Sequence, residues 1–119
     1  MGNENINVRV RRIHPDAILP QYAHEGDAGL DLHAVQDYVI KVGSREMVRT
    51  GLQMAIPMGY EAQVRPRSGL AIKEGITVLN TPGTVDAPYR GEICVILMNH
   101  GQKDYEVKKG SRIAQLVFN

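Results

Sequence analysis

The stretch INVRVRRI, residues 6–13, alternates apolar and polar side chains with a period of two. Its apolar residues Ile6, Val8 and Val10 face one way and the polar residues between them face the other, as in a β-strand with one buried face. Short runs of similar character recur along the chain, and each predicts a strand. They are DYVIKV (37–42), EMVRT (46–50), YEAQVR (60–65), ITVL (76–79), EICVILM (92–98), DYEV (104–107) and RIAQLVF (112–118).

Glycine and proline interrupt these runs throughout the sequence. With twelve glycines and six prolines, the longest stretch free of both runs from Leu30 to Val42, so long helices are excluded. Many short strands joined by such turns predict an all-β fold, either a compact barrel or a jelly-roll-like sandwich. At most one short helix is expected, over residues 68–74, with Ser68 as its N-cap and Gly75 as its stop.

Length and charge limit the classes of function. The 119 residues, 43% of them hydrophobic, suit one domain that spans residues 1–119. The net charge is +1 and the basic residues are scattered, so no nucleic-acid partner is expected, whereas a small phosphate-bearing ligand is compatible. No segment approaches the roughly 20 apolar residues of a membrane span. Cys94, the only cysteine, cannot form an intramolecular disulfide, which predicts a reducing, cytoplasmic setting.

The segment EGDAGLDL, residues 25–32, places two carboxylates around Gly29 at the entry to a strand. Aspartate is a common turn-former at such positions, and this is one interpretation of Asp27 and Asp31. The other is a carboxylate that holds a metal-bound water, because Mg²⁺ prefers oxygen ligands and keeps several waters.

The segment RPRSGLA, residues 65–71, brings Arg65, Arg67 and Ser68 to a bend. Backbone N–H groups, a hydroxyl and a guanidinium at one place suit a phosphate. The alternative is a solvated basic turn that caps a helix.

The segment NTPGTVDAPYRGE, residues 80–92, holds Asp86 among residues that restrict or bend the backbone. An aspartate held stiffly in an apolar hairpin is suited to act as a general base. The alternative is an aspartate that accepts hydrogen bonds within its own turn. In GSRIAQLVF, residues 110–118, Gln115 lies on a predicted strand that, taken alone, is a plain surface strand.

Other chemistries find little support in the sequence. The four histidines lie far apart and lack the spacing of metal ligands, so a zinc site is not predicted. Cys94 lies within an apolar run, which argues against a thiol nucleophile. The sequence contains neither a Walker motif nor a dinucleotide-binding glycine pattern.

Taken together and in this order, the four segments resemble the homotrimeric deoxyuridine triphosphatases (dUTP diphosphatases, dUTPases). The resemblance covers residues 7–118 and is carried by AGLDL, PRSGLA, GTVDAPYRGE and RIAQL. It implies a distorted jelly-roll barrel, the dUTPase-like β-clip, assembled as a homotrimer with active sites at subunit interfaces. It also implies hydrolysis of dUTP to dUMP and pyrophosphate with Mg²⁺, which limits uracil incorporation into DNA and supplies dUMP for dTMP synthesis.

The resemblance implies roles for the residues around Asp86. Asp86 would orient and activate the water that attacks the α-phosphorus. Tyr89 would pack under the deoxyribose and leave no room for a 2′-hydroxyl. Asn80 and the backbone of a hairpin over residues 75–86, including Gly83 and Val85, would hydrogen-bond the uracil edge. Arg90, Gly91 and Glu92, which follow Tyr89, would brace the turn that contains Asp86.

The other motifs imply contacts with phosphate and metal. Arg67, Ser68 and Gly69 would contact the phosphate chain, with Ser68 near the oxygen that bridges the α- and β-phosphorus atoms. Gln115 would contact the distal phosphates. Asp31 would hold Mg²⁺ through water, the direct ligands being mainly the substrate phosphates.

The sequence lacks one motif of the family, and three rival functions compete with the dUTPase interpretation. The glycine-rich C-terminal segment of the family, with an arginine and an aromatic ring, has no counterpart in these 119 residues; a chain that lacks it is expected to bind nucleotide and turn over slowly. A dCTP deaminase is disfavoured because Ile96 stands where that family carries its catalytic glutamate. A dUTP-binding regulatory or protein-interaction module with reduced catalysis is the main alternative, and a purely structural jelly-roll leaves the four motifs unexplained.

Overall fold

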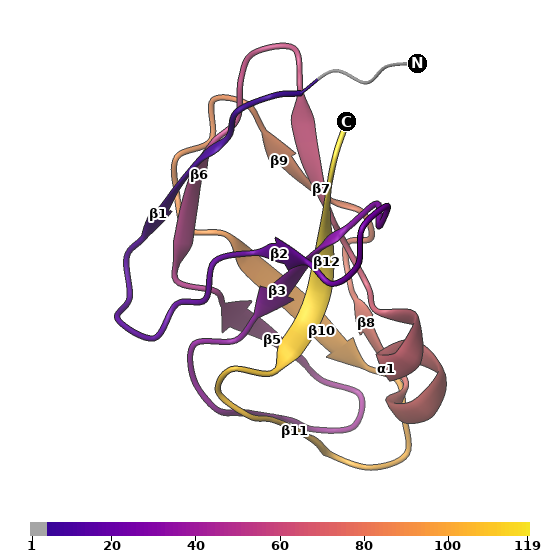
Figure 1. Ribbon diagram of the computed structural model, residues 1–119. Helices are drawn as coiled ribbons and strands as arrows, with labels where there is room; N and C mark the ends of the chain where they lie inside the picture. The colour runs from indigo at the N-terminus through magenta and orange to yellow at the C-terminus, as the bar shows by residue number, and fades with distance from the viewer. Residues whose placement is uncertain (1–4) are drawn as a thin grey trace.

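The computed structural model describes residues 5–119 and contains one short helix among short antiparallel strands (Figure 1). This confirms the all-β prediction. The elements in order are β1 (Arg9–Arg12), β2 (Gln21–Tyr22), β3 (Leu30–His33), β4 (Tyr38–Ile40), β5 (Arg45–Arg49), β6 (Leu52–Ala55), β7 (Glu61–Arg65), α1 (Ser68–Glu74), β8 (Ile76–Val78), β9 (Gly83–Asp86), β10 (Cys94–Asn99), β11 (Tyr105–Val107) and β12 (Arg112–Phe118).

Strands far apart in sequence pair with one another. The largest sheet has the order β2-β3-β12-β7-β9, and a second has the order β5-β10-β8. Two further sheets have two strands each, β1 with β6 and β11 with β4. In Figure 1, β12 runs through the middle of the largest sheet. Strand β9 pairs alongside β7 at the edge of that sheet, and α1 follows the end of β7.

The alternation seen in the sequence decides which side chains enter the core. In β10 every second residue is buried, and in β1 the apolar Val10 is half-buried between exposed arginines. All four sheets contribute to one cluster of buried side chains, in which Leu32, Ile40, Leu52 and Leu97 are almost fully buried. Burying apolar surface on this scale is the main stabilising contribution to such a fold.

The one helix covers its predicted range, residues 68–74, but its N-cap residue differs from the prediction. Ser68 is the first helical residue, and the N-cap is Arg67, which makes no side-chain capping bond. Gly75 ends the helix as predicted, in the left-handed region at φ 70°, with its N–H bonded to the Ala71 and Leu70 carbonyls. The described part of the chain has no helix with the length and apolar character to cross a membrane.

The segment over residues 75–86 is not the paired hairpin that the sequence suggested. Strand β8 pairs with β10, whereas β9 pairs with β7, so the two strands belong to different sheets. Each lies at the edge of its sheet. Edge strands carry backbone N–H and C=O groups that no neighbouring strand satisfies.

Candidate active site

Asp86 is the last residue of β9 and is exposed at the start of a tight turn. Its neighbours Val85 and Ala87 are buried to 8% and 7% exposure, so the backbone on both sides is anchored in the core. The turn is closed by the Asp86 backbone carbonyl, which accepts the Tyr89 N–H at 3.0 Å. The carboxylate is therefore left to solvent on a rigid support, which differs from the alternative in which it served its own turn.

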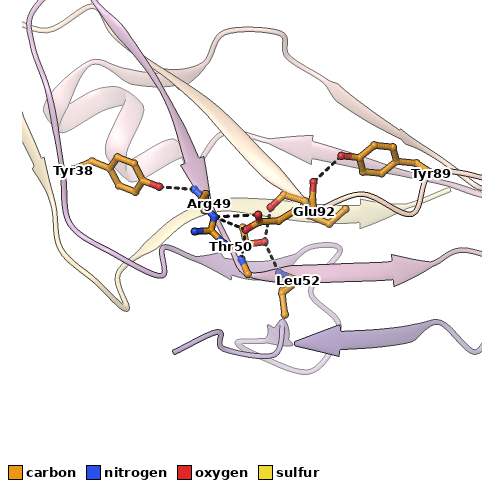
Figure 2. A network of polar contacts seen from close by, with 8 residues as sticks. Tyr38, Arg49, Thr50, Leu52, Tyr89 and Glu92 are labelled. Atoms are coloured by element: carbon orange, nitrogen blue, oxygen red, sulfur yellow. Dashed lines mark hydrogen bonds and ion pairs between the residues drawn. The ribbon is translucent and has the colours of Figure 1, made fainter. Parts of the chain in front are cut away.

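Tyr89 is 46% exposed and its ring folds back over the turn. Its hydroxyl donates to the Glu92 backbone carbonyl at 2.8 Å (Figure 2). A Cβ at Gly91 would lie 2.5 Å from the tyrosine hydroxyl oxygen and 2.7 Å from Cζ. Glycine at position 91 is thus what lets the ring occupy this place.

Glu92 is tied to strands that lie more than forty residues earlier in the sequence. Both carboxylate oxygens accept the Arg49 Nε–H at 3.1 Å, and Oε2 also accepts the Gly51 N–H at 2.8 Å. Tyr38 accepts the Arg49 backbone N–H at 3.0 Å through its hydroxyl. Figure 2 shows Glu92 standing between Arg49 and Tyr89. The sequence indicated Glu92 as a brace but contained no signal for Arg49.

A hollow of about 340 Å³ lies beside Asp86 and Tyr89, partly apolar in its walls. Cys94 and Ile96 of β10 line it, together with the exposed Met47 of β5. Burial raises the pKa of the Cys94 thiol, and the Glu92 charge raises it further, so the thiol stays neutral. Ile96 offers no group for proton transfer at the position where a deaminase needs its glutamate.

The loop before β9 brings together Asn80 and Gly83, two residues predicted to contact the base. Asn80 is exposed, and its side-chain amide lies against Gly83, where an added Cβ would be 3.4 Å from Asn80 Nδ2. Gly83 is itself buried against Val64. The Val85 side chain is directed into the core, so a ligand on the exposed side of β9 would meet its backbone and not its side chain.

A second polar cluster forms where β3, β12 and the start of α1 meet, and we call it the β3–β12 cluster. Asp31 lies opposite Gln115 in the sheet, and its carboxylate is 3.7 Å from Arg112 Nη1. Arg67 donates to the Arg112 carbonyl at 3.4 Å. Ser68 follows Arg67 and is exposed. The cluster is made of Asp31, Arg67, Ser68, Arg112 and Gln115.

Two glycines shape the cluster. At Gly29 an added Cβ would lie 2.6 Å from Gln115 Oε1, so the glutamine side chain occupies the space that a larger residue would fill. At Gly69 an added Cβ would meet nothing within 4 Å, which leaves the first turn of α1 open to a ligand. Asp27, by contrast, accepts the His24 N–H at 2.9 Å and is the turn-former that its position suggested.

His33 adjoins the cluster and was not singled out by the sequence. It lies opposite Arg112 in the sheet, and its Nδ1 is buried without a hydrogen-bond partner among residues 5–119. Burial lowers its pKa, an effect that the Asp31 charge opposes and the nearby arginines strengthen. The imidazole is thus favoured in its neutral form.

The Asp86 turn and the β3–β12 cluster share one face of the largest sheet but lie well apart. Residues opposite one another in a sheet point to the same face, as do alternate residues of a strand. On β7, Glu61 lies opposite Asp86 and Arg65 lies opposite Gln115. The four residue steps from Glu61 to Arg65 span about 13 Å at roughly 3.3 Å per residue. Within one copy, the two groups cannot meet at a single phosphorus atom.

The donor set fits a Mg²⁺ that arrives with a substrate. No three His, Cys, Asp or Glu side chains gather into a metal cage within residues 5–119. The β3–β12 cluster holds one carboxylate, Asp31, which is 17% exposed. Mg²⁺ commonly binds through one or two carboxylates together with substrate phosphates and keeps several waters.

Comparison with solved structures identifies the fold. The dUTPase from phage phi11 of S. aureus matches with a TM-score of 0.89 at 22% identity, covering 96% of this chain and 90% of that chain. The Staphylococcus bacteriophage 80alpha dUTPase with dUPNHPP gives 0.90 at 23% identity, covering 97% and 83%. The fold is therefore the jelly-roll-like β-clip that the resemblance implied, here with two polar groups on one face of its largest sheet.

Sequence comparison then assigns the family. The dUTPase family model matches residues 15–119. The deoxyuridine 5'-triphosphate nucleotidohydrolase of Clostridium acetobutylicum is 56% identical over 113 residues, covering 95% of this chain and 78% of that protein. Its counterpart in a Picosynechococcus species is 54% identical over 113 residues, covering 95% and 80%. The chain belongs to the dUTPase family of enzymes.

Proposed function

We propose that this chain hydrolyses dUTP to dUMP and pyrophosphate, with Asp86 as the base that activates water. Family membership supports the reaction, and the observation that carries the assignment of the base is the rigid display of Asp86. Its carboxylate is exposed while the residues on either side are buried. Rigid display matters because alignment of a nucleophile for in-line attack contributes several powers of ten to rate.

In the proposed step, Asp86 accepts a proton from a water molecule as the water oxygen bonds to the α-phosphorus. The bond from the α-phosphorus to the α,β-bridging oxygen breaks, and its electron pair leaves with pyrophosphate. Ser68 donates a hydrogen bond near the bridging oxygen, where negative charge grows. Stabilising charge that develops only in the transition state raises the turnover number more than equal stabilisation of bound substrate does.

Selectivity for the deoxynucleotide is assigned to the segment around Asn80 and Tyr89. The Tyr89 ring packs under the deoxyribose and excludes a 2′-hydroxyl. Asn80 and the backbone edges of β8 and β9 hydrogen-bond the uracil. The strand pairing supports this assignment, because β8 and β9 are edge strands that do not pair with each other. A site with buried polar groups that match one base rejects other bases, since a wrong base leaves those groups unpaired.

The phosphate chain is assigned to the β3–β12 cluster. Arg67, Ser68 and Gly69 contact it at the open start of α1, and Gln115 contacts the distal phosphates. Asp31 would hold a Mg²⁺ through water, and the ion would neutralise charge on the substrate phosphates. A variant of the phi11 phage protein coordinates a structural Mg(II) ion.

A homotrimer with shared active sites accounts for the separation of the two groups. Asp86 must reach the α-phosphorus and Ser68 the adjoining bridging oxygen, yet within one copy the register places their surroundings about 13 Å apart along β7. A second copy that brings its β3–β12 cluster to this copy's Asp86 removes the conflict. The number three follows from the family resemblance.

The regulatory alternative, a dUTP-binding module with reduced catalysis, is not favoured. Relatives that share 50–56% of their residues with this chain are named as nucleotidohydrolases.

The single cysteine and the nucleotide substrate suit a reducing cytoplasm.

The test is pyrophosphate release with Mg²⁺ from dUTP, dTTP, dCTP and UTP, compared between the chain and its Asp86→Asn variant. We expect release from dUTP alone, and a loss of roughly 10²- to 10⁴-fold in the variant, the usual contribution of a general base. Calorimetric titration of dUTP should show binding by both proteins. Full turnover by Asp86→Asn would remove Asp86 from the mechanism. Tight, selective dUTP binding without turnover by the unaltered chain is the result expected of a chain without the family's C-terminal segment, whereas no dUTP binding would overturn the proposed function.

A further inference from the structure

Arg65 is the last residue of β7, and the proposed function gives it no role. Its side chain is exposed on the face of the largest sheet that also carries Asp86 and Gln115. The charge of Arg112 is partly offset by Asp31, 3.7 Å away, whereas no ion pair within residues 5–119 includes Arg65. Arg65 therefore places a positive charge without an acidic partner on the face proposed to bind the phosphates.

Gln63 holds the Arg65 guanidinium over this face. Its Oε1 accepts the Arg65 Nε–H at 3.1 Å and an Nη2–H at 2.7 Å. Alternate residues of a strand point to one face, so the two side chains lie on the same side of β7. Neither bond uses the Nη1 donors. The planar guanidinium is thus restrained by one edge, and its remaining N–H groups suit the oxygens of a phosphate.

Arg65 ends a row of three polar side chains that crosses the sheet. Asp31 of β3 lies opposite Gln115 of β12, and Gln115 lies opposite Arg65 of β7. Neighbouring strands are about 5 Å apart, and side chains directly opposite one another are within mutual reach. A group bound over Gln115 consequently has Asp31 on one side and Arg65 on the other. A phosphate held by Gln115 is within reach of the guanidinium.

We propose that Arg65 binds the distal phosphates of the nucleotide beside Gln115, and that Gln63 positions it. This inference rests on the proposed function, in which Gln115 contacts those phosphates. A triphosphate chain carries more negative charge than one Mg²⁺ neutralises, so a further cation at this place has charge to balance. Hydrogen bonds from a guanidinium to phosphate oxygens are charge-assisted and stronger than neutral ones. Arg65 contacts phosphates away from the reacting α-phosphorus, so it stabilises bound substrate and transition state alike.

The test compares Arg65→Gln with Arg11→Gln, which removes the same charge from an exposed position in another sheet. Calorimetric titration with Mg²⁺ measures the Kd for dUMP, which has no distal phosphates, and for dUpNHpp, an analogue with an imido group in place of the α,β-bridging oxygen. We expect Arg65→Gln to raise the Kd for dUpNHpp roughly tenfold, the usual size of a hydrogen bond to a charged group, and that for dUMP by less than about twofold. Arg11→Gln should leave both values unchanged.

Steady-state kinetics with dUTP provide a second readout. Arg65→Gln should raise KM by about the same factor and leave kcat nearly unchanged, as expected for an interaction made equally in ground and transition states. Gln63→Ala should give a smaller rise, and adding it to Arg65→Gln should cause no further one, because Gln63 acts through Arg65. Arg65→Lys should recover part of the affinity, since lysine keeps the charge but lacks the planar guanidinium.

The outcomes separate this inference from the proposed function. An unchanged Kd for dUpNHpp in Arg65→Gln, beside binding by the unaltered chain, would overturn the role of Arg65 alone. An equal loss in Arg11→Gln would do the same by indicating a general effect of net charge, and so would an equal loss for dUMP. No binding of dUpNHpp by the unaltered chain would overturn the proposed function and the role of Arg65 with it. Because Arg65 is exposed, its variants should keep the thermal midpoint of the unaltered chain.

Discussion

At the scale of single residues, the missing side chain of glycine decides where two side chains of the candidate site lie. Gly91 makes room for the Tyr89 ring, and Gly29 makes room for the Gln115 amide. Neither glycine has a left-handed backbone, so their importance is the space they leave and not their conformational freedom. A methyl group at position 91 would displace the Tyr89 ring of the same turn, and one at position 29 would displace the Gln115 side chain of β12.

Gly29→Ala is expected to weaken the binding of substrate. The new Cβ would lie 2.6 Å from Gln115 Oε1 and 3.0 Å from Gln115 Cβ, so the glutamine must leave its place. Because Gln115 is assigned to the distal phosphates, which remain bound throughout the reaction, KM for dUTP should rise by about tenfold while kcat changes less. Steady-state kinetics with dUTP measure both quantities.

The control for this prediction is the double variant Gly29→Ala with Gln115→Ala. If Gly29 acts through Gln115, the rise in KM of the double variant should not exceed that of Gln115→Ala alone. If the effects of the two substitutions on KM are independent, so that the double variant shows both in full, Gly29 does not act through Gln115.

Some residues of the site were predictable from local sequence and others were not. Asp86 stands in a dense run of turn-forming residues, which predicted a restrained backbone around it, whereas Asn80 was assigned only through the family resemblance. Arg49 gave no such signal, because its contact with Glu92 depends on the register between β5 and β10, which places Arg49 opposite Cys94. Register between distant strands is a property of the whole sheet and cannot be read from either segment alone.

At the scale of elements, the strands that the sequence predicted are those with clear alternation and β-branched residues, such as β10 and β12. Strand β6 was missed although its burial alternates, because Leu52 to Ala55 reads LQMA, whose residues favour helices. Strand β9 reads GTVD and was hidden by turn-forming residues at both ends. Its separation from β8 into another sheet is decided by tertiary pairing.

Asn99 joins the end of β10 to two other elements and is fully buried. Its Nδ2 donates to the Ile40 carbonyl of β4 at 2.8 Å and to the Lys103 carbonyl at 2.9 Å. Its Oδ1 accepts the Gly101 N–H at 2.8 Å. One side chain therefore satisfies three backbone groups where the connection from β10 to β11 begins.

Asn99→Ala should lower the free energy of unfolding by about 2–4 kcal/mol, because buried backbone groups left without partners cost about 1–3 kcal/mol each and water can satisfy some of them. Asn7→Ala, at an exposed position, should change it by less than about 0.5 kcal/mol. Chemical denaturation at matched protein concentrations provides the comparison. Equal stability of the two variants would show that the Asn99 bonds are replaced by water.

At the scale of the whole molecule, the Asp86 turn and the β3–β12 cluster lie apart on one face of the largest sheet. Asp86 lies opposite Glu61 at the start of β7, and Gln115 of the β3–β12 cluster lies opposite Arg65 at its end. A rigid sheet cannot bring these ends together. The proposed assembly solves this by joining the Asp86 of one copy to the β3–β12 cluster of another.

Mixing two inactive variants should therefore restore activity. Asp86→Asn damages one half of the site and Arg67→Ala the other, so each alone should be nearly inactive. After the two are unfolded and refolded together in equal amounts, roughly a quarter of the sites should receive two intact halves from random assembly. Pyrophosphate release from dUTP measures the recovery. No recovery, with mixed oligomers shown to be present by mass spectrometry, would mean that each copy builds its own site.

The central place of β12 also has a consequence for the time course of folding. This strand follows all the others in the described chain, yet it pairs with both β3 and β7 and separates them. Until β12 is inserted, β3 and β7 have open edges, and the largest sheet has no middle. Chains dominated by such distant pairings fold over roughly milliseconds to seconds, and their unpaired strand edges favour aggregation during that time. The yield on refolding should consequently fall as protein concentration rises.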